Sequence, residues 1–141
     1  MKALKFTVLS LVIMLIATPA FAGFGLGAVL QDFDHFGVQA RTAFGLGGDI
    51  SEITGAAAIY FDNTWMTFDA DYHFILKGGE TRFYPLAGLE LATDFSDWTE
   101  FGVNLGGGMD FMMSKSLAAF AEAKFVAWGV NGLNLTLGFK F

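Results

Sequence analysis

Apolar and polar residues alternate along most of the chain after residue 22. The clearest case runs from Met66 to Phe74, where the even-numbered residues are apolar and the odd-numbered residues are Thr67, Asp69, Asp71 and His73. A period of two places each set on its own face of a β-strand, whereas a helix would scatter both sets around its circumference. The pattern therefore predicts strands.

Eight segments of this kind are separated by short runs of turn-forming residues, among them Gly48-Asp49 and Asn131-Gly132. The segments are 24–32, 36–47, 51–61, 65–76, 81–93, 99–112, 116–128 and 131–141. A strand that crosses a membrane needs about 9–11 residues, so eight strands and short turns account for nearly all of residues 23–141. We predict an all-β domain over 23–141, an eight-stranded antiparallel up-and-down barrel.

The two faces of these strands differ in a way that indicates which one meets lipid. One face is rich in Leu, Ile and Phe, and the other carries a few charged groups among many Gly and Ala residues. A water-soluble barrel would expose far more Lys and Glu than this second face holds. The inverse arrangement fits better, with apolar side chains facing lipid and polar and small ones facing inward. In lipid the backbone groups need partners, so the sheet must close.

The first 22 residues resemble a secretory signal rather than part of the barrel. Lys2 and Lys5 precede a short apolar run, Pro19 ends it, and Ala20 and Ala22 satisfy the small-x-small rule for cleavage. We expect a signal peptide over 1–22, cleaved after Ala22, and export to the periplasm by the Sec route.

Composition narrows the possible functions. The chain has no Cys, which excludes a disulfide scaffold and a thiolate metal site. Loss of Lys2 and Lys5 changes the formal charge from −6 to −8, and an acidic chain without a basic cluster argues against binding of nucleic acid.

The parity of eight strands places both ends of the domain on one side, which we take as the periplasmic side. The opposite, outer loops are then 32–35, 62–63, 94–100 and 128–131, and they are acidic. Tyr60, Trp65, Trp98 and Trp128 fall near the outer rim. The inner rim has its own aromatic set: Tyr72, Phe74, Phe83, Tyr84, Phe111, Phe139 and Phe141. Aromatic girdles at both interfaces are typical of membrane barrels.

Three segments resemble a known family. They are the strand 82–91 with its Tyr84-Pro85-Leu86-Ala87-Gly88 core, the strand pair 108–125, and the terminal 135–141. They are similar to the small Gram-negative outer-membrane barrels of the OmpA-transmembrane-domain and OmpX-like group. The resemblance implies an outer-membrane location, with Phe139 and Phe141 forming the signal read by the outer-membrane assembly machinery.

The inward charges are the candidate chemistry of the chain. We expect a polar network in the lumen that consists of Arg41, Asp69, Asp71, His73, Glu90, Asp110, Glu122 and Lys124. A salt-bridged plug is favoured over a catalytic or metal site, because charges in a narrow barrel must be paired. We predict no catalytic residue, metal ligand or cofactor.

The predicted function is that of a small, non-enzymatic outer-membrane barrel, monomeric, with a structural or small-solute role and no general diffusion pore. Its expected partners are outer-membrane lipid, lipopolysaccharide and the assembly machinery. Two alternatives stay open. One is an enzyme that modifies lipid A or phospholipid, and the other is a secreted soluble barrel that binds an apolar ligand inside.

Overall fold

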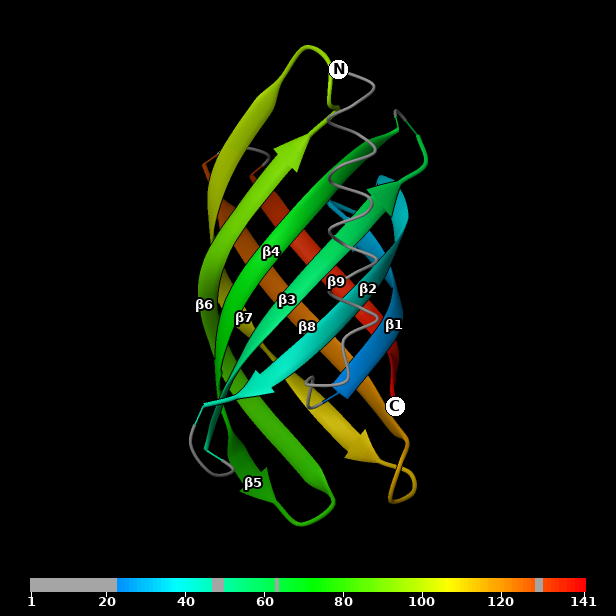
Figure 1. Cartoon of the computed structure of the whole chain (residues 1–141), viewed down its shortest axis with the longest axis vertical. Helices are drawn as coiled ribbons and strands as arrows, with labels where there is room; N and C mark the ends of the chain where they lie inside the picture. The colour runs from blue at the N-terminus through cyan, green and yellow to red at the C-terminus, as the bar shows by residue number, and fades with distance from the viewer. Residues whose placement is uncertain (1–22, 47–49, 63, 129–130) are drawn as a thin grey trace.

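The computed structural model describes residues 23–46, 50–62, 64–128 and 131–141, which form one closed β-barrel (Figure 1). The strands are β1 (Gly23–Gln31), β2 (His35–Gly45), β3 (Ser51–Tyr60), β4 (Trp65–Phe74), β5 (Leu76–Gly78), β6 (Thr81–Thr93), β7 (Thr99–Met112), β8 (Ala118–Ala127) and β9 (Gly132–Lys140). The predicted signal peptide, with Ala20 and Ala22, lies outside the described residues.

All neighbouring strands are antiparallel, and β1 pairs with β9 to close the ring. β5 follows β4 after Ile75, and both pair with β6, so β4 and β5 together form one of eight barrel strands. The predicted eight-stranded barrel is therefore confirmed, with strand ends that differ from the predicted ones by at most two residues. Between the predicted segments 65–76 and 81–93, Gly78 ends β5 and the chain turns at Gly79, whose φ is +69°.

The barrel has two ends, which we name by what lies there. The terminal end carries Gly23, Phe141 and the turns before β3, β6 and β8. The loop end carries the turns before β2, β4, β7 and β9. In Figure 1 the strands are strongly tilted relative to the long axis of the barrel, and β5 lies at the bottom of the view.

The apolar face of the strands points outward, as predicted. Leu89, Phe101 and Leu137 are 62%, 74% and 65% exposed, whereas the polar residues of the opposite face are mostly buried in the lumen. In the described residues no helix is both long and apolar enough to cross a membrane.

Three aromatic residues assigned to the rims differ from the rest. Tyr60, Trp65 and Tyr84 are at most 6% exposed, so these three lie inside the lumen, whereas the other aromatic residues of the rims face outward. Their positions share the parity of the polar face, and parity decides the direction of a side chain in a strand.

Apolar side chains fill the lumen near each end. Tyr60 and Trp65 stack with ring centroids 4.0 Å apart and pack with Val29 and two alanines at the loop end. Ile75, Tyr84 and Leu86 form a smaller cluster toward the terminal end. The charged residues of the lumen occupy the space between these clusters and at the terminal mouth.

Candidate functional site

The first group of buried charges surrounds one lysine, and we call it the Lys124 cluster: Asp69, Asp71, Glu90, Asn104 and Lys124. Lys124 Nζ donates to Asp69 Oδ1 at 2.8 Å and to Asp71 Oδ2 at 3.0 Å. Asn104 Nδ2 donates to the same two carboxylates at 2.8 and 2.7 Å. All five residues are at most 6% exposed.

The second group is centred on Glu122 of β8, which accepts hydrogen bonds from Arg41 and Tyr84. Arg41 Nη1 and Nη2 lie 2.8 and 3.1 Å from its two oxygens, a bidentate pair. Tyr84 Oη donates to Oε2 at 3.0 Å. Gln39 accepts from Arg41 Nε at 3.0 Å, and the guanidinium lies 4.3 Å from the centre of the Phe120 ring. This geometry orients both partners.

His73 links this group to the terminal end. Its ring stacks on Tyr84 at 4.2 Å, with Nδ1 3.3 Å from Glu52 Oε1 and Nε2 3.9 Å from Glu122 Oε2. His73 is fully buried. The imidazole therefore lies between two carboxylates and against an aromatic face.

The terminal mouth of the lumen contains a looser set of ion pairs. Lys140 Nζ lies 2.9 Å from Asp110, while Arg82 lies between Glu52 and Asp110 at 3.5 and 3.6 Å. A cavity of about 190 Å³ opens here, and Lys115 of the turn before β8 also lines it.

The structure thus brings the eight predicted network residues into the lumen. They lie in three places: Asp69, Asp71, Glu90 and Lys124 in the Lys124 cluster, Arg41, His73 and Glu122 in the second group, and Asp110 at the mouth. Sequence reasoning did not assign Tyr84 and Asn104 to the network, although both have inward parity. The alternation gives the inward direction of both side chains but not their partners, which lie on other strands.

These contacts are those of an ion-paired plug. In the described part of the chain, no three His, Asp or Glu side chains are arranged to hold a metal ion. Among the described residues, His35 contacts Asp62 and hydrogen-bonds no hydroxyl group, and Thr54 Oγ1 lies 3.5 Å from His73 Nδ1. Thr54 is 3% exposed and lies inside the lumen.

Asp32, Asp62 and Asp94 of the loop end have local structural partners. Asp62 contacts His35, Asp32 Oδ1 accepts from Leu133 N at 2.8 Å, and Asp94 Oδ1 accepts three backbone N–H groups. The N–H of Ser96, followed by those of Trp98 and Asp97, holds the pKa of Asp94 below its ordinary value. These carboxylates shape their turns.

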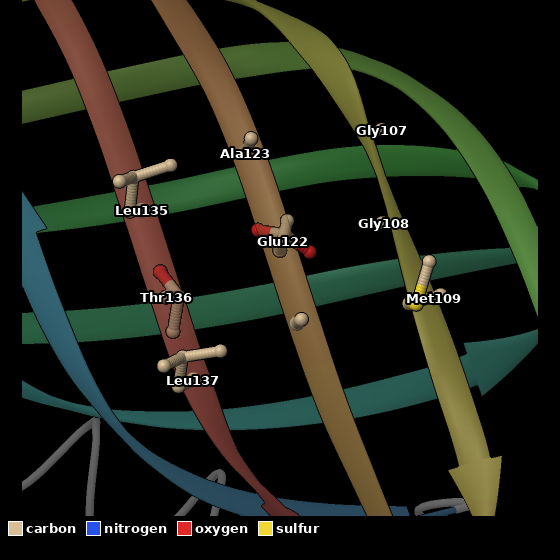
Figure 2. A pocket seen from close by; sticks show the side chains of 9 residues that line it. Gly107, Gly108, Met109, Glu122, Ala123, Leu135, Thr136 and Leu137 are labelled. Carbon is tan, nitrogen blue, oxygen red and sulfur yellow. The ribbon is translucent and has the colours of Figure 1, made fainter.

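The outer surface is uneven where small residues face outward. Figure 2 shows Ala123 of β8 between Gly107 of β7 and Leu135 and Leu137 of β9. The resulting groove has a volume of about 420 Å³ and an almost wholly apolar lining.

No protein-family model matches the sequence, and no curated protein matches it. The fold, in contrast, is similar to those of solved barrels. The N-terminal β-barrel domain of Pseudomonas aeruginosa OprF superposes with a TM-score of 0.64 at 17% identity, over 84% of this chain and 97% of that domain.

Two other solved barrels are similar over 84% of this chain and 97% of their own. They are the Yersinia pestis outer membrane protein Ail in a phospholipid nanodisc, with a TM-score of 0.57 at 12% identity, and the outer membrane enzyme PagL, with 0.53 at 8%. The chain therefore has the fold of the small OmpA- and OmpX-like barrels. A fold shared with an enzyme does not by itself decide the activity.

Proposed function

We propose that this chain is an integral protein of the bacterial outer membrane, monomeric, with a structural or small-solute role and no general diffusion pore. The observation that carries the proposal is the inverted polarity of the barrel: exposed Leu and Phe outside, and buried, hydrogen-bonded ion pairs inside. Only lipid makes that arrangement favourable, because apolar surface of this extent is costly in water.

The direction of the apolar face also tests the alternative of a secreted soluble barrel. A secreted barrel that binds an apolar ligand would need the Leu and Phe face in its lumen, and the structure has that face outside, so this alternative is wrong. The lumen instead contains Arg41, Lys124 and their carboxylate partners.

The route to the membrane rests on the sequence. Residues 1–22 would direct export, and Phe139 and Phe141 would be read by the assembly machinery. In the folded barrel both aromatic side chains face outward, at 49% and 61% exposed. Lipid and lipopolysaccharide are the proposed surroundings of the folded barrel.

A spin label tests which surface meets lipid. The chain has no native Cys, so Leu137→Cys on β9 gives a single label, and Lys115→Cys on a turn at the mouth is the matched control. In vesicles the label at 137 should be accessible to lipid-dissolved oxygen and the label at 115 to a water-soluble reagent. A protein that stays soluble without detergent, with both labels accessible to water, would contradict the proposal.

The enzyme alternative is tested separately, since PagL shows that this fold can support catalysis. We propose a non-enzymatic role because the described residues bring no hydroxyl nucleophile against His35 at the loop end. Mass spectrometry of lipid A and phospholipid, from cells with and without the protein, should give identical spectra. A new lipid species that depends on the protein would overturn this part.

A further inference from the structure

The Lys124 cluster contains more negative than positive groups. Asp69, Asp71 and Glu90 contribute three carboxyl groups, and Lys124 contributes the one ammonium. Burial of an unpaired charge is strongly unfavourable. The cluster as a fully ionised set would therefore be unstable.

The hydrogen bonds show which of the three carboxyl groups has no donor in the described part of the chain. Lys124 and Asn104 both donate to Asp69 and to Asp71, which gives each of these carboxylates two donors. Glu90 is 2% exposed, and neither of its oxygens accepts a hydrogen bond from any described residue.

Glu90 lies beside another carboxylate rather than a cation. It is the cross-strand partner of Asp69 in the β4–β6 ladder, a position in which side chains of one face are in contact range. Its partner on the other side, in β7, is Gly102, which offers no side chain.

The remaining elements supply no cation for Glu90. Tyr60 of β3 and Asp71 of β4 are the other titratable groups near it, and Lys124 of β8 is engaged with the aspartates. Arg41 of β2 is committed to Glu122. β1 and β9 place Val29 and Asn134 at this level of the lumen, neither of which titrates.

We propose that the Asp69–Glu90 pair binds one proton in the folded barrel at neutral pH. Glu90 is then a neutral carboxylic acid, and its O–H donates to Asp69. A buried carboxyl group beside a like charge takes up a proton instead of remaining ionised.

Binding of this proton makes the stability of the folded barrel depend on pH. In the unfolded chain both carboxyl groups are ionised at pH 7, since ordinary Asp and Glu titrate near pH 4. The folded barrel therefore binds one more proton at this site, and for this site the ratio of folded to unfolded protein falls about tenfold for each unit of rising pH.

Infrared spectroscopy detects the neutral acid directly. Wild-type barrel folded in lipid vesicles at pH 7 should show the C=O stretch of a protonated carboxylic acid, distinct from carboxylate bands. Glu90→Gln should abolish it, because an amide can replace the acid as a donor to Asp69 without disturbing the packing. Glu100→Gln, at an exposed position, is the matched control and should leave the band unchanged.

Unfolding equilibria give a second readout. Between pH 5 and pH 7 the wild type should lose stability relative to Glu90→Gln by about tenfold in the folding equilibrium constant per pH unit. The absence of the acid band in the wild type would overturn the proposal, and so would its persistence in Glu90→Gln. Parallel pH dependence of the two proteins would also contradict it.

Discussion

Lys124 shows how one buried residue can hold several carboxyl groups in place. Its ammonium is 2% exposed and is the cation that contacts Asp69 and Asp71. Removal of one partner from a buried ion pair leaves the other charge uncompensated, which is far more costly than loss of a surface pair. The residue therefore matters more for stability than its single charge suggests.

The substitution Lys124→Met tests this role. We expect it to lower the free energy of unfolding by about 3–5 kcal/mol, the usual cost of an orphaned buried charge. Urea unfolding of the barrel in lipid vesicles measures the change. The control Lys115→Met, on an exposed turn, should change stability by less than about 0.5 kcal/mol. Similar small effects of both substitutions would mean that the cluster is hydrated.

Asp94 illustrates the opposite, exposed case. Its carboxylate accepts backbone N–H groups from Ser96, Trp98 and Asp97, and this lowers its pKa. A carboxyl group with a lowered pKa in the folded state contributes stability above its ordinary pKa of about 3.9 and loses that contribution as the pH falls. This contribution to stability concerns only the turn that begins at Asp94.

An NMR titration of the Asp94 carboxyl carbon should give a pKa below the ordinary value. The turn 94–98 should loosen as the pH falls through that value, seen as faster exchange of the Ser96 and Asp97 amides. A normal or raised pKa would show that the turn does not depend on these hydrogen bonds.

At the scale of the element, β7 shows why glycine lines this barrel. A Cβ on Gly106 would lie 2.2 Å from the carbonyl oxygen of Ala123 and 2.5 Å from Lys124 Cα. The neighbouring strand β8 could not approach as closely with any larger residue there. Glycine is thus required by a close approach of two backbones.

A comparison of two strand glycines tests this argument. Gly106→Ala should destabilise the barrel by about 1–3 kcal/mol, the usual cost of overpacking. Gly55→Ala on β3 should be neutral or slightly stabilising, since the nearest atom to its Cβ is 4.0 Å away. Refolding yield and urea unfolding measure both. Equal behaviour of the two variants would contradict the close-approach explanation.

At the scale of the whole molecule, the lumen is closed by three layers. Tyr60 and Trp65 fill the loop end, ion pairs occupy the middle, and Tyr84 and Leu86 pack toward the terminal end. An eight-stranded barrel is just wide enough for its own side chains. We therefore predict that the interior leaves no general diffusion path.

Vesicles that contain the protein should swell in iso-osmotic sugar no faster than protein-free vesicles. A general porin provides the positive control, and Glu122→Ala, which removes the acceptor of Arg41 and Tyr84, shows whether the plug can be opened. Swelling that increases with the amount of wild-type protein would contradict a closed lumen.

The sequence by itself determined the barrel and its polarity. In a strand, each side chain points opposite to the next, so the alternation at Met66–Phe74 and its counterparts decides both the strands and their two faces. The number of strands follows from the number of alternating segments. The alternation also predicts that the side chain of Tyr60 points inward, although tyrosine is a residue type that is typical of the membrane interface.

Only the tertiary structure decided which inward groups meet. The contacts of Lys124 with Asp69, of Arg41 with Glu122 and of Tyr84 with Glu122 join residues 38 to 81 positions apart. These contacts depend on the tilt of the strands and on how far neighbouring strands are offset along the barrel when the sheet closes. The alternating pattern of a single strand does not give this offset. For the same reason, only the closed barrel shows that Glu90 lies beside Asp69 without a hydrogen-bond donor from the described residues.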